Sequence, residues 1–284
     1  MTPKKFKDIV WKYYREHGRH ELPWRKTTDA YRILVSEVML QQTQVERVIP
    51  YYARFLKKFP TVRALAASPL SQVLIEWQGL GYNRRAKMLH EAAKAVVGLH
   101  NGTFPASAAE LEELPGIGPY TAGAITAFAH NQDGLFIETN IRTAITHHFF
   151  NTESDNRNQS TIIYDSALFK IDDREIMKVL EKVFPKGQAR EWYAALMDYG
   201  TYLKRSGVRI NAKAKGYAKQ STFKGSAREA RGAILRALVT GPKKASELVQ
   251  LLGTDRKEQL NAQITALTND GLVRRSRAGV VLAD

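Results

Sequence analysis

Apolar residues recur every three or four positions through most of the first 200 residues, which is the spacing of amphipathic helices. Four of them share one face of an N-terminal helix that stops at Gly18: Ile9, Val10, Tyr13 and Tyr14. The segment from Asp29 to Val48 keeps an apolar face in the same way. Because the alternation typical of strands is scarce there, the sequence predicts an all-α protein.

Serine, proline and glycine mark where the helices begin and turn. Ser68 followed by Pro69 is typical of an N-cap with proline at the first helical position, and Ser107 with Glu110 fits a capping box. Two segments place a Gly-apolar-Gly turn between expected helices: residues 78–82 and residues 115–119.

The last third of the chain changes character. Residues 204–231 carry nine Lys and Arg residues against the single acid Glu229, so we expect a basic linker or DNA-facing loop at 204–226. Beyond it, the pattern predicts three helices and a hairpin: Ala227–Leu238, Ala245–Leu252, Arg256–Thr268, and Gly271–Arg274 with Gly279–Leu282. This order is typical of a small winged-helix-like module, which we place at 227–284.

Composition narrows the class of partner. The 284 residues include 43 Lys and Arg against 28 Asp and Glu, a net charge of +15, which favours a polyanion. Charge alone does not separate DNA, RNA and anionic membranes. The N-terminus is charged throughout and no 18-residue apolar run exists, so we expect a cytoplasmic protein with no membrane partner.

The sequence contains no cysteine. Disulfides, thiolate zinc sites and iron–sulfur clusters are therefore excluded, and we expect no metal site.

The turn within residues 114–123 has the chemistry of a phosphate clamp. Gly116 and Gly118 carry no side chain that would block a phosphate, and Pro119 suits a helix start. The N–H groups of the following helix, from Tyr120 and Thr121 onward, would face the phosphate. The alternative is a tight helix–helix turn that contacts no ligand.

Four segments together resemble one known family. Residues 114–123 are similar to the hairpin of the helix-hairpin-helix (HhH-GPD) DNA glycosylase superfamily, which includes endonuclease III and MutY. Three further segments resemble MutY-type adenine glycosylases: Leu-Pro-Trp-Arg at 22–25, Ser-Glu-Val-Met-Leu-Gln-Gln-Thr-Gln-Val at 36–45 and Trp-Gln-Gly-Leu-Gly-Tyr at 77–82. The resemblance runs from about Phe6 to Tyr202.

The resemblance implies a two-lobed helical glycosylase domain over residues 1–203. The six-helix hairpin lobe would span about 29–133, and the second lobe would combine 1–28 with 134–203. It also implies double-stranded DNA as the partner, bound by a monomer near the nucleoid.

Glu37 is the first candidate catalytic residue. It borders an apolar helix surface, where a carboxyl group should have a raised pKa and could donate a proton. The alternative is a partly exposed Glu at the edge of the apolar stripe. The resemblance implies that Glu37 is the acid that protonates a ring nitrogen of the extruded adenine.

The second carboxylate is expected at Glu138. The superfamily places an Asp in this segment, whereas the present chain has Phe-Ile-Glu-Thr-Asn-Ile-Arg at 136–142. Cleavage of an N-glycosidic bond builds positive charge on the sugar, which an anion near C1′ stabilises or traps. By the same resemblance Asn140 orients this carboxylate. The alternative is that Glu138 caps its own helix or pairs with Arg142.

Other positions bear on DNA binding and on the type of glycosylase. Strand-nicking relatives carry a Lys where this chain has Tyr120, and a Tyr cannot form a Schiff base. Gln42 and Tyr82 match residues that fill the space left by the extruded base. Arg25 and the hairpin backbone are further expected DNA contacts, and that backbone could hold a monovalent cation.

Two features depart from the family pattern. MutY-type enzymes usually hold a four-cysteine iron–sulfur cluster after the helix matched by Trp192–Leu203, where this chain has Lys204 and Arg205 instead. They also recognise 8-oxoguanine through a C-terminal Nudix-like domain, for which residues 225–284 are too short and too helical. We therefore leave the opposing base open.

Three hypotheses follow for the function. The first is a monofunctional glycosylase of base excision repair that removes a mispaired adenine or another damaged purine. The second is a thymine, uracil or modified-base glycosylase of the same superfamily. The third is a catalytically silent DNA-binding protein built on this scaffold.

Overall fold

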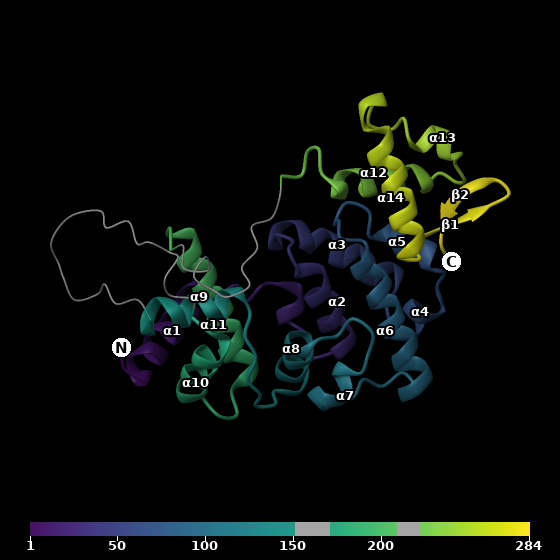
Figure 1. The fold of residues 1–284 in the computed structure, drawn as a ribbon. Coiled ribbons are helices and arrows are strands. Elements are labelled where there is room, and N and C mark those ends of the chain that lie inside the picture. The colour runs from purple at the N-terminus through teal and green to yellow at the C-terminus, as the bar shows by residue number, and fades with distance from the viewer. Residues whose placement is uncertain (151–170, 209–221) are drawn as a thin grey trace, which may run out of the picture. The chain divides into compact units, whose positions relative to one another are not determined.

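The computed structural model describes residues 1–150, 171–208 and 222–284. They are predominantly helical, with one two-stranded hairpin, which confirms the all-α prediction. Figure 1 shows the helices in chain order. The chain divides into two compact units: unit 1 combines residues 1–28 with 119–219, and unit 2 combines 29–118 with 220–284.

Unit 1 is built around two long helices that pack closely. Its elements are α1 (Pro3–His17), η1 (Pro23–Arg25), α8 (Pro119–His130), α9 (Thr139–Phe149), α10 (Asp173–Val183) and α11 (Ala189–Arg205). Phe6 of α1 meets Trp192 of α11 edge to face, with ring centroids 6.2 Å apart, and both side chains are fully buried. The two helices α9 and α11 approach closely at Gly200, where an added Cβ would collide with the carbonyl group of Asn140.

Unit 2 begins with six helices: α2 (Ala30–Leu40), α3 (Val45–Lys58), α4 (Val62–Ala67), α5 (Leu70–Glu76), α6 (Arg84–His100) and α7 (Ala108–Glu112). Their core is apolar and aromatic. Phe55 packs edge to face against both Phe59 and Trp77, with centroids 4.8 and 5.9 Å apart. Residues 119–133 were expected in this lobe, whereas α8 clusters with unit 1.

Several helix boundaries differ from those expected. The apolar segment from Asp29 to Val48 is two helices, because the chain turns at residues 41–44 with Gln42 at a φ of +55°. Ser68 ends α4, and Pro69 is the N-cap of α5, so Ser68 is not a helix start. Ser107 does cap α7, but its hydroxyl donates to the Glu110 carboxylate at 2.5 Å where a capping box would use the backbone N–H.

The C-terminal residues form a small helical module that belongs to unit 2. It contains α12 (Ala227–Leu238), α13 (Ala245–Leu248), η3 (Thr254–Arg256), α14 (Lys257–Asn269), β1 (Val273–Ser276) and β2 (Gly279–Leu282). The strands are antiparallel, with Val273 opposite Leu282. Of the basic linker expected at 204–226, α11 takes up residues 204–205, and residues 209–221 lie outside the described residues.

Two polar contacts attach the C-terminal module to the helices of the same unit. Lys87 Nζ donates to the carbonyl oxygen of Asp270 at 2.7 Å, and Ser71 Oγ donates to the Asp284 carboxylate at 2.8 Å. The module is therefore joined to α5 and α6 at two separate places. Within the described part of the chain, none of the helices combines the length and the apolar character needed to cross a bilayer.

We expect Gly200→Ala to destabilise the protein by about 2 kcal/mol, because the new methyl group forces α9 and α11 apart. Gly98→Ala is the matched control: Gly98 is an exposed residue in α6 whose Cβ would meet nothing within 4 Å. That change should stabilise the protein by up to about 1 kcal/mol through helix propensity alone. Urea unfolding of both variants measures the difference, and equal stabilities would contradict the close helix contact.

Candidate functional site

Glu37 is a buried acid on an apolar helix. Asp29 caps α2, accepting hydrogen bonds from the backbone N–H groups of Tyr31 and Arg32 at 2.8 and 3.2 Å. Nearly every side chain from Tyr31 to Met39 is buried, and Glu37 itself is only 5% exposed. The structure therefore contradicts the alternative that Glu37 is partly exposed at the edge of the stripe.

Arg85 joins the two turns that carry Gln42 and Tyr82, the residues expected to fill the space left by the extruded base. Its Nη1 donates to the carbonyl oxygens of Val38 and Met39 at 2.8 and 3.1 Å, at the end of α2. Its Nη2 donates to the carbonyl oxygen of Gly81 at 3.1 Å and to Thr43 Oγ1 at 3.3 Å. Burial lowers the pKa of Arg85 to about 10, which leaves the guanidinium charged at neutral pH. Arg85 is not among the residues predicted from the sequence.

Gln42 and Tyr82 both occupy the left-handed backbone region, with φ of +55° and +48°. This region is costly for residues with a side chain, and here the surrounding hydrogen bonds enforce it. Gln42 is exposed, and the ring of Tyr82 is half-buried, with the guanidinium of Arg85 5.5 Å from its centroid. Both positions lie in unit 2 and both lie beside Arg85.

Gly116 and Gly118 of the hairpin differ in why glycine suits each position. Gly116 has a φ of +74°, and a Cβ there would approach the Met88 Cβ to 2.5 Å, so packing against α6 requires glycine. A Cβ at Gly118 would meet nothing within 4 Å, so its backbone is open. In unit 1, Tyr120 packs edge to face on Phe136 at 5.7 Å, and Thr121 is only 3% exposed. The hydroxyl of Thr121 is therefore closed to a phosphate.

Glu138 is the N-cap of α9. Its Oε1 accepts from the backbone N–H groups of Asn140 and Ile141 at 2.7 and 2.8 Å. Its Oε2 accepts from Asn140 Nδ2 and Thr139 Oγ1, both at 3.1 Å. The capping alternative is thus correct as a description of its contacts, whereas the Arg142 alternative is wrong, since Arg142 pairs with Asp173 at 2.7 Å.

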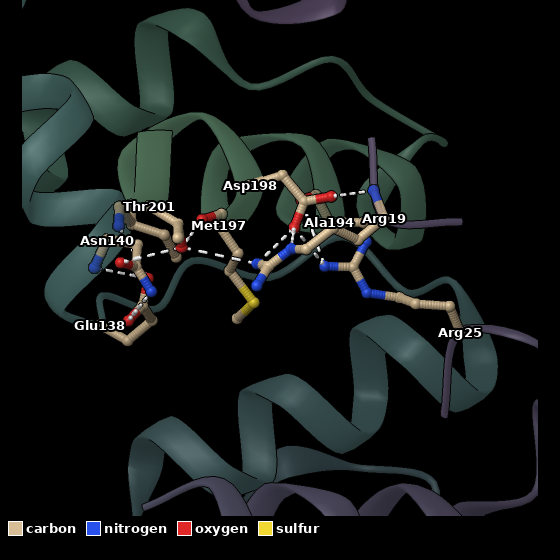
Figure 2. A network of polar contacts seen from close by, with 9 residues as sticks. Arg19, Arg25, Glu138, Asn140, Ala194, Met197, Asp198 and Thr201 are labelled. Carbon is tan, nitrogen blue, oxygen red and sulfur yellow. Dashed lines mark hydrogen bonds and ion pairs between the residues drawn. The ribbon is translucent and has the colours of Figure 1, made fainter. Parts of the chain in front are cut away.

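Asn140 links Glu138 to a buried ion-pair cluster on α11 (Figure 2). The hydroxyl of Thr201 lies 3.4 Å from Asn140 Oδ1 and 2.8 Å from the carbonyl oxygen of Met197. Arg19 Nη2 reaches the same hydroxyl at 3.5 Å and donates to Asp198 Oδ1 at 2.6 Å. One polar network therefore runs from the Asp198 carboxylate to the Glu138 carboxylate.

Arg25 belongs to this cluster. Its Nη2 lies 3.1 Å from Asp198 Oδ1 and 3.4 Å from the carbonyl oxygen of Ala194, and its side chain is 11% exposed. The guanidinium expected to contact DNA therefore holds α11 instead, and little of its surface is open to a phosphate.

Lys204 lies at the end of α11 on the Glu138 side of the network. Its Nζ is 3.5 Å from Thr139 Oγ1. Burial lowers the pKa of Lys204, and the neighbouring Glu138 carboxylate partly opposes that shift. The sequence predicts no contact between Lys204 and Glu138, since Lys204 stands out there only as a basic residue where relatives have a cluster ligand. Among the described residues, no three His, Asp or Glu side chains are grouped as a metal site.

Comparisons with known proteins identify the family that this chain matches. Residues 35–185 match the model of the HhH-GPD superfamily of base excision DNA repair proteins. The chain is 36% identical over 203 residues to a protein named adenine DNA glycosylase from Buchnera aphidicola, covering 72% of this chain and 54% of that protein. It is also 36% identical over 186 residues to one of the same name from Mycolicibacterium smegmatis, covering 65% and 59%. The chain thus spans somewhat over half the length of these relatives.

Solved structures share the fold. A thermostable thymine-DNA glycosylase is 25% identical with a TM-score of 0.58, over 70% of this chain and 85% of that one. An endonuclease III trapped in a covalent complex with DNA is 19% identical with a TM-score of 0.55, over 74% and 89%. The second likeness concerns the fold alone.

We expect Asp198→Asn to lower the free energy of unfolding by about 3 kcal/mol, because Arg19 and Arg25 would lose their shared anion inside unit 1. Asp8→Asn, at an exposed position of α1, is the control and should change stability by less than about 0.5 kcal/mol. Urea unfolding measures both. A similar small effect for the two variants would show that the cluster contributes little to the fold.

Proposed function

The chain belongs to the HhH-GPD superfamily of base excision DNA repair proteins, and on that premise we propose that it is a monofunctional DNA glycosylase that removes mispaired adenine. The observation that carries this proposal is Glu37, a carboxyl group only 5% exposed on an apolar helix inside the matched segment. The names of the relatives support adenine as the target. We propose double-stranded DNA with a mispaired or damaged base as the substrate of a monomer acting in the cytoplasm at the nucleoid.

Glu37 would act as the general acid. Its proton passes to a ring nitrogen of the extruded adenine, and the electron pair of the N-glycosidic bond then leaves with the base. A protonated purine is the better leaving group because it departs neutral. Water adds to C1′ of the resulting oxocarbenium ion and releases a proton, so the products are free adenine and an abasic sugar.

Glu138 would stabilise the oxocarbenium ion as an anion and would not trap it covalently. A carboxylate has about four lone-pair directions, and in this structure four hydrogen bonds occupy them. Attack on C1′ would break at least one of these bonds, whereas electrostatic stabilisation keeps all of them. Asn140 holds the carboxylate in place from two sides, through its backbone and its side chain.

Tyr120 makes the proposed enzyme monofunctional, because a phenol cannot form a Schiff base with the sugar. A strand-nicking lyase would instead leave an adduct that borohydride traps. For DNA contacts we propose the backbone N–H groups around Gly118, Tyr120 and Thr121 at a phosphate, where a monovalent cation could also bind, and Gln42 with Tyr82 as the residues that enter the duplex.

Removal of thymine is the second candidate. The fold and 25% identity shared with a thymine-DNA glycosylase favour it. The acid at Glu37 favours a purine, because protonation of a ring nitrogen helps purine departure most.

We expect Glu37→Gln to lower the single-turnover rate of adenine release by about 10²-fold or more, because the amide has no proton to donate. The assay uses duplexes with adenine opposite guanine, cytosine and 8-oxoguanine, with thymine–guanine and uracil–guanine duplexes alongside. Cleavage of the pyrimidine duplexes only would transfer the assignment to the second candidate. Tight binding with no cleavage by the unmodified chain would indicate a silent DNA-binding protein.

We expect Glu138→Gln to slow adenine release by about 10²-fold while leaving stability within about 1 kcal/mol of the unmodified chain. The amide oxygen still accepts the backbone hydrogen bonds that cap α9, but it carries no charge. Rate and urea unfolding are measured on the same preparation. Glu138→Ala is the matched comparison, since it removes both cap and charge. An unchanged rate in Glu138→Gln would mean that Glu138 serves only as the helix cap.

A further inference from the structure

Arg142 lies one helical turn beyond Glu138, and the proposed chemistry does not use it. Its backbone N–H donates to the carbonyl oxygen of Glu138 at 2.9 Å. Residues four apart are neighbours on the surface of a helix, so Arg142 and Glu138 lie close together at the start of α9. A cation therefore accompanies the carboxylate that would stabilise the sugar.

An acid of α10 holds this arginine. Arg142 Nε donates to Asp173 Oδ1 at 3.0 Å, and Nη2 donates to Oδ1 and Oδ2 at 2.8 and 2.7 Å. Asp173 is in the first turn of α10. Nη1 has no hydrogen-bond partner among the described residues. The guanidinium is thus fixed in direction and keeps one amino group available.

Exposure separates this ion pair from the other arginine–carboxylate cluster of unit 1. The Asp173 side chain is 52% exposed, whereas that of Asp198, which binds Arg19 and Arg25, is 1% exposed. An exposed ion pair contributes little to stability, because water solvates both charges when they separate. The Arg142 pair can therefore open to another anion, whereas the Asp198 cluster is closed.

A phosphodiester group is the anion that Arg142 would meet on DNA. It offers two oxygens to a guanidinium in the same paired geometry as a carboxylate, so it can take the place of Asp173. The proposed substrate also needs a cation here. Without one, the Glu138 carboxylate would repel the two phosphates that flank the target sugar.

We propose that Arg142 binds a phosphate flanking the target nucleotide, and that Asp173 occupies the guanidinium until DNA replaces it. The proposal rests on the proposed function, because that function places the target sugar at Glu138. Asp173 acts as an internal competitor that weakens binding to DNA. Each phosphate that a cation neutralises adds to the salt dependence of binding, which makes the contact measurable.

The first measurement is binding of the full chain to a duplex that carries tetrahydrofuran, an abasic-sugar analogue, at the target position. It does not depend on cleavage. We expect Arg142→Gln to reduce the slope of log affinity against log salt by about 0.9, the value for one phosphate. Arg142→Lys, which keeps the charge, should retain most of the slope, and thermal unfolding shows whether each variant is folded.

Lys182→Gln is the matched control for the lost charge. Lys182 is exposed and lies at the opposite end of α10 from Asp173. This variant should keep the slope of the unmodified chain. An unchanged slope in Arg142→Gln, or an equal reduction in the two variants, would overturn the phosphate contact.

The second measurement tests the exchange of partners. Asp173→Asn should raise affinity for the same duplex by up to about fivefold, because Arg142 no longer has an ion pair to break. Glu175→Gln removes the same charge from an exposed position of α10 that does not bond to Arg142, and it should bring a smaller gain. In the Arg142→Gln background, Asp173→Asn should bring no gain. A gain that persists there, or an equal gain in Glu175→Gln, would overturn the exchange.

A neutral methylphosphonate, placed in turn at each phosphate beside the tetrahydrofuran, locates the contact. At one of the two positions Arg142→Gln should cost no further affinity, and an undiminished cost at both would overturn the assignment to the target nucleotide. Single-turnover release of adenine is measured separately. Duplex binding without base release would refute the proposed function, whereas a reduced slope in Arg142→Gln would still support the phosphate contact. No binding to any duplex would refute both.

Discussion

The arrangement of unit 2 depends on the buried guanidinium of Arg85. The C-terminal end of α2 and the turn after Trp77 both present carbonyl groups that no helix satisfies, and Arg85 donates to carbonyl oxygens from both. Hydrogen bonds to a charged group each contribute about 1.5–3 kcal/mol, and leaving such carbonyls unpaired would be costly. The same contacts hold Gln42 and Tyr82 in backbone conformations that those residues rarely adopt. The hydrogen bonds of this one guanidinium therefore offset both the cost of its desolvation and the backbone strain of the two turns.

In unit 1 a buried carboxylate, that of Asp198, holds separate segments of the chain together. The Asp198 side chain is only 1% exposed and gathers the guanidinium groups of Arg19 and Arg25 from the segment that follows α1. Through Thr201 this cluster reaches Asn140 and then Glu138 (Figure 2). The Glu138 carboxylate is thus held by hydrogen bonds from its own helix. A Glu at this position, one methylene longer than the Asp of the family, still reaches both free N–H groups at the start of α9.

The C-terminal module adds arginines to the basic residues that the other helices of unit 2 supply. Its helices and hairpin have an apolar core of their own, and hydrogen bonds from Ser71 and Lys87 join it to α5 and α6. Arg228 and Arg231 thereby lie beside Tyr82 and Asn83, which are about 150 residues away in the sequence. A net charge of +15 becomes informative only when such residues are seen to share one pocket.

Sequence alone determined the helical class, the helix α12 to the residue and the hairpin after residue 272, because these depend on local periodicity, capping and short motifs. It gave no sign of the break within 29–48, and it placed the N-cap of α5 at Ser68, one residue before the Pro69 that the structure shows. It assigned Arg25 to DNA and passed over Arg85, since a guanidinium has the same local pattern whether it meets a phosphate or a buried carbonyl. Only the tertiary structure decided those partners, because the groups that satisfy a buried charge come from distant parts of the chain.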